Sequence, residues 1–428
     1  MQVCVEPAQA PLRGSLTVPG DKSISHRAAL LAALAVGVSR ITGFNPGEDT
    51  QSTLECLRLL GATIQGEDNT LFVEGPSRLQ EPGTILDAGN SGTTIRMLTG
   101  ILAASDFFSV ITGDPSLRRR PMGRIVGPLT EMGAEIRGRK GDQLAPLAIR
   151  GRPLHGRHHR LVVASAQVKS ALLFAGMLAR GTTRISEPYP SRDHTERLFA
   201  HAGLELGARR DGVEVRGEQR PRPFTLRVSG DISGAAFFVT AACILAGSNL
   251  KVEGVGLNPT RLGFLRVLRR MGAQINTEIV KEAPEPWGDI VVQGSTLLGT
   301  DIDQAEVPSL IDELPVLAVA ASVAQGRTRM KGVGELRHKE SDRLANTCAL
   351  INSMGGQAEI SGDDLVITGG PLRGTCIQAR GDHRMAMTAA VAGLVATGPT
   401  TISGCECVNI SYPAFFDEFR RLGAIFHD

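Results

Sequence analysis

The chain has 428 residues, of which 42% are hydrophobic, and a formal net charge of +2. This length exceeds the usual size of a single core, so we expect two domains of about 200 residues each. The 46 lysines and arginines are spread along the sequence without a basic tail, which argues against non-specific nucleic-acid binding. The seven cysteines are scattered and show no C-x-x-C spacing, which argues against a disulfide framework and a zinc site.

The chain begins with Met1-Gln2-Val3-Cys4-Val5-Glu6, which lacks the pattern of a signal peptide. Its longest nearly apolar run, Ala235 to Ala246, is too short to span a bilayer. We therefore expect a cytoplasmic protein with neither a membrane nor a nucleic-acid partner.

The next segment, Val18-Pro19-Gly20-Asp21-Lys22-Ser23-Ile24-Ser25-His26-Arg27, places a turn, a hydroxyl cap and two cations ahead of the apolar run Ala28 to Val36. A helix that starts in this way presents free backbone N–H groups and a partial positive charge, to which Lys22 and Arg27 add two full charges. The segment therefore predicts an anion site. Taken alone, it is equally compatible with a capped surface helix that carries two solvated cations.

A short glycine signature recurs six times along the chain. The copies are Leu60-Gly61-Ala62, Met132-Gly133-Ala134, Ala202-Gly203-Leu204, Met271-Gly272-Ala273, Met354-Gly355-Gly356 and Leu422-Gly423-Ala424. Successive glycines are 72, 70, 69, 83 and 68 residues apart. Each signature follows an amphipathic pattern and precedes a short strand pattern, as a glycine after a helix C-terminus should. The chain is therefore predicted to be a repeat of six α+β units.

Each unit also starts alike, with polar residues ahead of an alanine-rich helix that is apolar almost all round and is expected to be buried. These starts are Ser23-Ile24-Ser25, Asn90-Ser91-Gly92-Thr93, Ser165-Ala166-Gln167, Asp231-Ile232-Ser233, Ile311-Asp312-Glu313 and Asp382-His383-Arg384. Because equivalent helices of a repeat begin at the same end, we expect the starts of one domain to cluster.

Two similar segments mark the boundary between the sets of three units. Val228-Ser229-Gly230-Asp231 repeats the pattern of Val18-Pro19-Gly20-Asp21. We expect one domain of residues 19–229 and a discontinuous domain of residues 1–18 plus 230–428, with an N-terminal strand from Val3 to Thr17 in the second. The crossings near residues 18–20 and 228–230 would be hinges between lobes that open and close a cleft.

Charged residues concentrate at the unit starts. The cations include Lys22, Arg27, Arg96, Arg118-Arg119-Arg120, the segment Arg337 to Arg343, and His383-Arg384. Cations from both domains that face one cleft predict a substrate with several anionic groups. Asp312 and Glu340 would lie among them, where a carboxylate stays ionised and can accept a proton, while the neighbouring Lys339 can donate one.

Each of these features also has a purely structural explanation. The pairs in Lys339-Glu340 and Asp342-Arg343 could be surface ion pairs worth about 0–1 kcal/mol each, and Arg118 to Arg120 could be a solvated turn. The carboxylates Asp312, Glu313 and Asp382 could be simple helix caps. For His383 we favour a structural histidine, and the same explanation is open for His194. The sequence has no metal-ligand cluster, P-loop or G-x-S-x-G motif, so we expect phosphate chemistry without metal or nucleotide.

Six motifs, in order and at the same spacing, resemble those of the 5-enolpyruvylshikimate-3-phosphate synthase family. They are Lys22-Ser23-Ile24-Ser25-His26-Arg27, Gly89-Asn90-Ser91-Gly92-Thr93, Arg120-Pro121-Met122-Gly123, Ser165-Ala166-Gln167, Lys339-Glu340-Ser341-Asp342-Arg343 and Asp382-His383-Arg384-Met385-Ala386-Met387. The resemblance extends from about Leu16 to Pro413. Further motifs resemble the bacterial class II subgroup: Gly20-Asp21-Lys22-Ser23, Ser165-Ala166-Gln167-Val168-Lys169, Arg192-Asp193-His194-Thr195-Glu196 and Asn258-Pro259-Thr260-Arg261.

The resemblance implies an α+β fold with α/β-type repeats, a two-domain inside-out α/β barrel of six βαβαββ units, three in each domain. It implies transfer of the enolpyruvyl group of phosphoenolpyruvate to the 5-hydroxyl of shikimate 3-phosphate, with release of phosphate, in the shikimate pathway of aromatic amino acid biosynthesis. The implied partners are these two small molecules, with no cofactor and no metal, and we expect a monomer.

The resemblance also assigns site residues by motif. Those that would bind shikimate 3-phosphate are Lys22, Ser23, Arg27, Ser165, Ala166, Gln167, Arg192, Asp312 and Lys339. Those that would surround phosphoenolpyruvate are Lys22, Gly92, Arg120, Gln167, Lys339, Arg343 and Arg384. Asp312 and Glu340 would transfer protons in an addition and elimination through a tetrahedral intermediate, and Lys22 would help phosphate to leave.

The sequence departs from the family in one place and carries an informative glycine in another. The family often has a lysine near the segment Ser411-Tyr412-Pro413, but here Val408-Asn409-Ile410 has none and Lys339 is the last lysine of the chain. Some class II members have alanine at the position of Gly92, and that methyl group is linked to resistance to glyphosate, which occupies the phosphoenolpyruvate site. We therefore expect glyphosate to inhibit this chain more strongly than it inhibits a Gly92→Ala variant.

Two alternatives remain open. The UDP-N-acetylglucosamine enolpyruvyl transferases share the implied fold and second substrate, but they use a loop cysteine that the corresponding loop, Gly113 to Met122, lacks. A non-catalytic anion-binding scaffold could keep the repeat without the chemistry, although it would not need both Asp312 and Glu340 among the cations.

Overall fold

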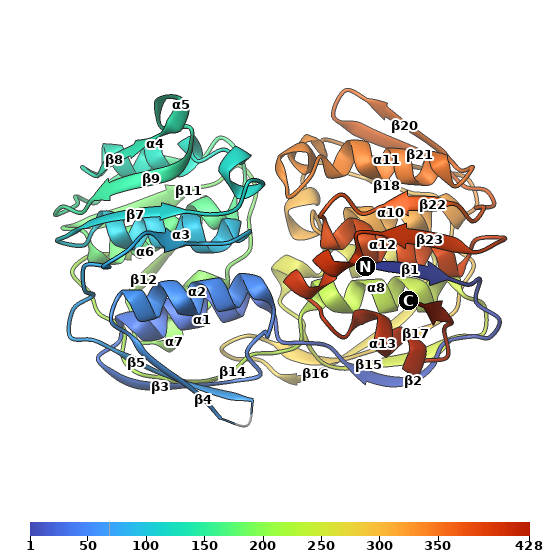
Figure 1. The fold of residues 1–428 in the computed structure, drawn as a ribbon, viewed down its shortest axis with the longest axis horizontal. Coiled ribbons are helices and arrows are strands. Elements are labelled where there is room, and N and C mark those ends of the chain that lie inside the picture. The colour runs from blue at the N-terminus through green and yellow to red at the C-terminus, as the bar shows by residue number, and fades with distance from the viewer. Residues whose placement is uncertain (68) are drawn as a thin grey trace. The chain divides into compact units, whose positions relative to one another are not determined.

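A computed structural model describes residues 1–67 and 69–428 (Figure 1). The chain forms two compact lobes, each with its own hydrophobic core. We call Gly20–Val228 the continuous lobe, and Met1–Pro19 together with Ser229–Asp428 the split lobe. Whether the two crossings between them act as hinges stays a prediction.

Each lobe contains three four-stranded sheets with one shared topology. In every sheet one edge strand pairs in parallel with its neighbour, and the other neighbouring strands pair antiparallel. Each sheet completes a βαβαββ unit, in which one helix lies in the interior of the lobe. The predicted two-domain fold with three units in each domain is confirmed.

The elements of the continuous lobe follow one another in three such units. Its helices are α1 (Lys22–Leu34), α2 (Glu48–Leu59), α3 (Gly92–Ala103), η1 (Leu117–Arg119), α4 (Gly123–Glu131), α5 (Arg139–Asp142), α6 (Ala166–Leu178) and α7 (His194–His201). Its strands are β3 (Gly37–Thr42), β4 (Thr63–Glu67), β5 (Thr70–Gly75), β6 (Leu86–Asp87), β7 (Phe108–Thr112), β8 (Glu135–Gly138), β9 (Leu144–Arg150), β10 (His158–Arg160), β11 (Thr182–Ser186), β12 (Leu206–Arg209), β13 (Gly212–Arg216) and β14 (Thr225–Arg227).

The split lobe repeats this order. Its helices are α8 (Ile232–Ile244), η2 (Pro259–Arg261), α9 (Gly263–Arg270), η3 (Val307–Ser309), α10 (Leu314–Val323), η4 (Gly334–His338), α11 (Arg343–Ser353), α12 (His383–Leu394), η5 (Cys405–Ile410) and α13 (Phe415–Arg421). Its strands are β1 (Gln2–Val5), β2 (Arg13–Thr17), β15 (Asn249–Gly256), β16 (Gln274–Lys281), β17 (Trp287–Gln293), β18 (Asp301–Ile302), β19 (Arg327–Met330), β20 (Gln357–Ser361), β21 (Asp364–Thr368), β22 (Cys376–Gln378), β23 (Thr400–Ser403) and β24 (Phe426–His427).

The alanine-rich helices are the interior helices, as expected from their sequence. In the continuous lobe α1, α3 and α6 are buried along most of their length, and α3 packs along α6. In the split lobe α8, α10 and α12 are buried in the same way and pack against one another. A helix that is apolar all round gains from burial on every side, so the three helices form the core and the sheets enclose them.

Each of the six signature glycines follows the second helix of its unit. All six have a left-handed backbone, with φ between 78° and 106°. Glycine adopts this conformation without the steric cost that a Cβ brings, which is why it ends these helices. The repeat read from the sequence is therefore confirmed at the level of backbone conformation.

The N-terminal segment differs from the prediction. It forms two strands rather than one strand from Val3 to Thr17, and β1 and β2 belong to different sheets of the split lobe. The prolines Pro7 and Pro11 lie between them and cannot donate backbone hydrogen bonds, so the ladder stops there. The predicted single strand was wrong, although both strands lie in the expected lobe.

Both strands that precede a crossing complete the sheet of the lobe that the chain is leaving. The strand β2 leads towards α1 but pairs with β15 in the split lobe. The strand β14 leads towards α8 but pairs with β3 in the continuous lobe. Each lobe thus receives the first strand of one unit from a distant part of the chain.

Among the residues that the structure describes, no helix combines the length and the apolar character needed to cross a membrane.

Candidate active site

The three interior helices of the continuous lobe begin with capped first turns. The side chains of Asp21, Ser91 and Ser165 each accept a hydrogen bond from a backbone N–H of the first turn that follows. Side-chain bonds then join one first turn to another: Gln167 donates to the Thr93 hydroxyl at 3.0 Å. The unit starts of this lobe therefore lie at one end, as the repeat predicted.

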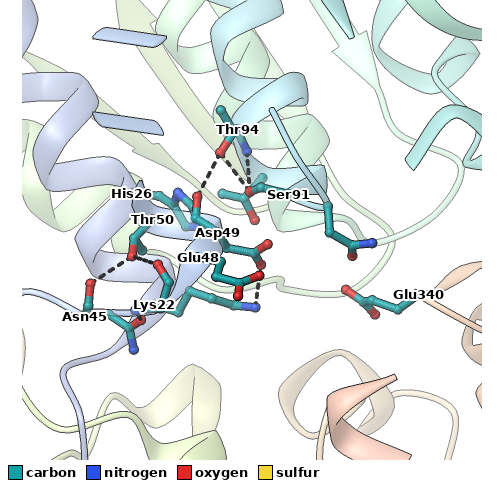
Figure 2. A network of polar contacts seen from close by, with 12 residues as sticks. Lys22, His26, Asn45, Glu48, Asp49, Thr50, Ser91, Thr94 and Glu340 are labelled. Atoms are coloured by element: carbon teal, nitrogen blue, oxygen red, sulfur yellow. Dashed lines mark hydrogen bonds and ion pairs between the residues drawn. The ribbon is translucent and has the colours of Figure 1, made fainter. Parts of the chain in front are cut away.

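Lys22, in the first turn of α1, forms an ion pair that sequence reasoning did not find. Its Nζ lies 2.8 Å from Oδ2 of Asp49, and the two side chains are only 15% and 8% exposed. Asp49 belongs to the first turn of α2, and its carbonyl oxygen accepts a bond from the Thr94 hydroxyl at 3.5 Å. Figure 2 shows this network, which reaches Ser91 through Thr94. The available signal was the pair Glu48-Asp49 at a helix start.

Gly92 lies beside two arginines at the start of α3. A Cβ built on Gly92 would lie 2.7 Å from Nη1 of Arg96 and 3.3 Å from Nη1 of Arg120. Arg96 donates to the side-chain oxygen of Gln167, and Arg120 donates to that of Asn90. The missing side chain therefore leaves room for two guanidinium groups next to a helix N-terminus, which is a favourable setting for an anion.

The run Arg118 to Arg120 divides into different environments. Arg120 is buried, whereas Arg119 is exposed and Arg118 is partly buried, with its Nε 3.4 Å from the Asp114 carbonyl oxygen. A solvated turn explains Arg119 but not Arg120. Of the three, only Arg120 contacts the residues around Gly92.

Arg27 joins three helices of the continuous lobe. Its Nε donates to the Thr195 hydroxyl at 2.8 Å, and its Nη2 donates to the Ser170 hydroxyl at 2.9 Å. Its Nη1 donates to the carbonyl oxygen of Ser23 at 2.8 Å. Of the other predicted residues here, Ala166 is the first residue of α6, and Arg192 lies, partly exposed, just before α7.

In the split lobe the predicted residues gather around Arg343, which is buried. Its Nη2 lies 2.6 Å from Oε2 of Glu340, and its Nη1 lies 3.5 Å from Oδ1 of Asp312. Lys339 Nζ lies 3.3 Å from the same Asp312 oxygen, and Arg384 donates to the Asp312 carbonyl oxygen at 3.3 Å. The structure therefore brings both predicted proton-transfer carboxylates to one guanidinium group.

Asp382 fixes the orientation of that guanidinium group. Its carboxylate accepts bonds from Nε and Nη2 of Arg343 at 2.9 and 3.1 Å, and from the Ser341 hydroxyl at 2.8 Å. It also caps α12 by accepting a bond from the backbone N–H of Arg384. Burial alone would lower the pKa of Arg343, but Asp382 and Glu340 outweigh it and raise that pKa. The cap explanation for Asp382 is therefore correct but incomplete.

Glu313 has a different role from the cap that its position allowed. Its carboxylate accepts a bond from the Ser233 hydroxyl and lies 3.7 Å from Nη2 of Arg261, while it makes no cap bond. Arg261 also donates to Ser233 at 2.6 Å. This buried cluster ties the starts of α8 and α10 together directly beside Asp312. The sequence analysis named Arg261 only within a class II motif and missed its contact with Glu313, because the two residues are far apart in the chain.

The two histidines in question, His194 and His383, are both buried. Each begins a helix, α7 and α12 respectively. In residues 1–67 and 69–428, no group of three or more histidine, cysteine, aspartate or glutamate side chains could hold a metal ion.

Known proteins resemble this chain over almost all of its length. Residues 7–419 match the family described as EPSP synthase (3-phosphoshikimate 1-carboxyvinyltransferase). The chain belongs to the EPSP synthase family. A 3-phosphoshikimate 1-carboxyvinyltransferase of Pelotomaculum thermopropionicum is 49% identical over 416 residues, which cover 96% of each chain.

Solved structures agree with this assignment to the EPSP synthase family. The EPSP synthase of Acinetobacter baumannii has a TM-score of 0.88 and 39% identity, with 100% of this chain and 99% of the other covered. The enolpyruvyl transferase NikO of Streptomyces tendae has a TM-score of 0.82 at 18% identity, covers 100% of this chain and 98% of its own, and shares the fold. Membership in the class II subgroup and the ligand contacts of single residues stay predictions.

Proposed function

We propose that the protein transfers the enolpyruvyl group of phosphoenolpyruvate to the 5-hydroxyl of shikimate 3-phosphate and releases inorganic phosphate. The activity named for its family and for its relatives supports this reaction. The observation that carries the proposal is the cluster around Arg343, in which Asp312 and Glu340 both lie within 3.5 Å of one guanidinium group.

The split lobe would supply the proton-transfer groups. Asp312 would orient the 5-hydroxyl and accept its proton as the oxygen attacks the carbon that bears the phosphate ester. Glu340, in its protonated form, would deliver a proton to the methylene carbon, which becomes a methyl group. The product of this addition is a tetrahedral intermediate. Its carboxylate would be offset by Arg343 and Arg384, and its phosphate by Lys339.

The second step would be an elimination. The bond between the tetrahedral carbon and the phosphate oxygen breaks, and phosphate leaves with its electron pair. The proton that Asp312 accepted would pass to the leaving phosphate, so that Asp312 is ionised again. Lys22 and Arg120 would offset the charge on this leaving group. Glu340, now ionised, would remove a proton from the methyl group, so that the double bond of the enol ether forms again.

The continuous lobe would hold the phosphate groups of the substrates. Shikimate 3-phosphate would contact Lys22, Ser23, Arg27, Ser165, Ala166, Gln167 and Arg192 in this lobe, with Asp312 and Lys339 from the split lobe. Phosphoenolpyruvate would contact Lys22, Gly92, Arg120 and Gln167, with Lys339, Arg343 and Arg384 from the split lobe. Since both lobes would serve the same substrates, the proposal requires that the crossings act as hinges. We further propose a monomer that works in the cytoplasm.

The competing acceptor is UDP-N-acetylglucosamine. The family match favours shikimate 3-phosphate over it. The loop from Gly113 to Met122 also has no cysteine, so the residue that the alternative enzyme would use there is missing.

A phosphate-release assay tests the proposal directly. The purified protein would be given phosphoenolpyruvate with either shikimate 3-phosphate or UDP-N-acetylglucosamine, and Asp312→Asn would serve as the control. We expect release with shikimate 3-phosphate alone, and a loss of at least about 100-fold in Asp312→Asn. Release with the nucleotide sugar would establish the alternative, and release with neither acceptor would favour a non-catalytic scaffold.

The role of Glu340 needs a separate measurement. In a rapid-quench experiment we expect Glu340→Gln to form and consume the tetrahedral intermediate much more slowly than the wild type. Normal turnover of the intermediate in this variant would transfer the acid role to Lys339.

A further inference from the structure

Lys169 lies one turn after the start of α6 and is the centre of a buried ion cluster. Its Nζ is 2.8 Å from Oε1 of Glu196, 3.0 Å from Oε2 of Glu187 and 3.4 Å from the carbonyl oxygen of Ser191. The side chains of Lys169 and Glu187 are almost fully buried, and that of Glu196 is mostly buried. All three donors of the ammonium group therefore have an oxygen partner.

The cluster joins three separate elements of the continuous lobe. Lys169 belongs to α6, Glu196 to α7, and Glu187 to the loop between β11 and α7. Oε2 of Glu187 also accepts a bond from the backbone N–H of Ser191 at 3.3 Å. Lys169 and Glu187 thus hold both backbone polar groups of Ser191, the residue directly before Arg192.

The charge of the cluster indicates a structural rather than a ligand-binding role. Two carboxylates and one ammonium group leave a net negative charge, which does not attract a phosphate. Burial alone would lower the pKa of Lys169, but Glu196 and Glu187 raise it, and burial raises the pKa of Glu196. Without the lysine, two buried carboxylates would face each other unneutralised.

The loop is the part of the cluster that can move. The helices α6 and α7 pack through Phe174 and Phe199, whose ring centroids are 5.1 Å apart in an edge-to-face arrangement within the core. The segment from Glu187 to Asp193 has no helix or strand of its own. If the ion cluster is broken, the carboxylates separate most readily by displacement of this loop, and Arg192 is displaced with it.

We propose that Lys169 is a positioning residue, which acts through Glu187 and Ser191 to hold Arg192 where it binds the phosphate of shikimate 3-phosphate. The inference rests on the proposed function, because that function assigns Arg192 to this substrate. It adds a residue that does not itself touch the substrate. Its loss affects affinity for shikimate 3-phosphate more than it affects the chemical step.

The test compares Lys169→Met with a matched control, Arg184→Met. Arg184 lies on β11 in the same lobe and forms a 2.8 Å ion pair with Asp211, in which the side chains are 40% and 49% exposed, far more than those of the Lys169 cluster. Calorimetric titration with shikimate 3-phosphate gives Kd, and steady-state kinetics give kcat and both KM values. We expect Lys169→Met to raise Kd and KM for shikimate 3-phosphate at least about 10-fold, with kcat at saturation within about 3-fold. The control should change less than about 2-fold.

A double-mutant cycle with Arg192→Ala decides whether the effect passes through Arg192. If it does, Lys169→Met costs less than about 2-fold in Kd when Arg192 is already alanine. Two fully additive effects would overturn the inference. A merely structural role would lower the unfolding temperature and leave Kd unchanged, which would also overturn it. If Lys169→Met does not fold, Glu187→Gln takes its place in the same cycle, with the same expected and contradicting outcomes.

Failure of this inference differs from failure of the proposed function. A wild-type protein that neither binds shikimate 3-phosphate nor releases phosphate contradicts the proposed function. A wild type that does both, together with a Lys169→Met variant of unchanged Kd, contradicts only the role of Lys169.

Discussion

Replacing Gly92 with alanine perturbs the candidate site by a single methyl group. The new Cβ would lie 2.7 Å from Nη1 of Arg96, whereas ordinary contact begins at 3.4 Å. The guanidinium group must therefore move by about 0.7 Å, the difference between the two distances. A movement of this size breaks or bends the bond from Arg96 to Gln167. The clash falls on the end of a flexible side chain, so we expect the fold to tolerate it.

The magnitude follows from the bond that is lost. A hydrogen bond from a charged group contributes about 1.5–3 kcal/mol, which corresponds to about 10–100-fold in an equilibrium constant. We therefore expect Gly92→Ala to raise the inhibition constant of glyphosate by about 10–100-fold. The KM for phosphoenolpyruvate should also rise, because Arg120 adjoins the new methyl group and Gln167 loses its bond from Arg96, and both would contact this substrate. The KM for shikimate 3-phosphate should rise less, because Gln167, which bonds to the displaced Arg96, is one of several residues proposed to contact it.

The assay is phosphate release at several glyphosate concentrations, with Gly127→Ala as the control. Gly127 is exposed in α4, and a Cβ there would meet no atom within 4 Å. Equal inhibition of the wild type and Gly92→Ala would refute the steric reasoning. A comparable loss in Gly127→Ala would show that any added methyl in this lobe has the same effect.

Three further changes test other parts of the structure. Asp49→Asn removes the charged partner of Lys22, and we expect kcat/KM to fall about 10-fold or more. An unchanged kcat/KM would show that Asp49 does not position Lys22. Arg261→Met leaves the Glu313 carboxylate buried without its counter-ion. Denaturant unfolding should therefore show that the free energy of unfolding of the split lobe falls by about 3–5 kcal/mol. A fall below about 1 kcal/mol would contradict this. At pH 8 a thiol-alkylating reagent should modify the exposed Cys376 first. Burial raises the pKa of the thiols of Cys56, Cys243 and Cys407 to about 12 and keeps them protonated. Equal labelling of these thiols in the folded protein would refute the prediction.

Local features of the fold could be predicted from sequence, because a single residue or a short run of neighbouring residues determines them. The signature glycines mark positive φ wherever they occur, and the alanine-rich runs form the buried helices. The partner of a crossing strand could not be predicted in this way. The repeat placed residues 19–229, which include β14, in one domain, but nothing within Thr225–Arg227 indicates that its partner strand is β3.

The same distinction holds for the candidate site. The motifs identified Asp312, Glu340 and Arg343 as residue types suited to the chemistry. They did not indicate that Arg343 contacts both carboxylates, because that geometry depends on how α10, α11 and α12 pack. The motifs named Lys169 and Glu196 but not the ion pair between them, and the pair of Lys22 with Asp49 was missed for the same reason. A local pattern such as Glu48-Asp49 can mark a charged residue, but it does not identify an ion partner that lies 18 or 27 residues away in the chain.

The continuous lobe is an insertion into the split lobe, because Met1–Pro19 and Ser229–Asp428 together form one compact unit. The chain leaves and re-enters the split lobe at neighbouring points, since the backbone N–H of Asp231 donates to the carbonyl oxygen of Pro19 at 2.8 Å. At the other side, a side chain on Gly20 would lie 3.2 Å from Val228. Each of the six sheets is built from strands of one lobe alone. A chain without residues 20–228, with Pro19 joined to Ser229 by a short linker, would therefore present the Arg343 cluster alone, as an independent test of what that half binds.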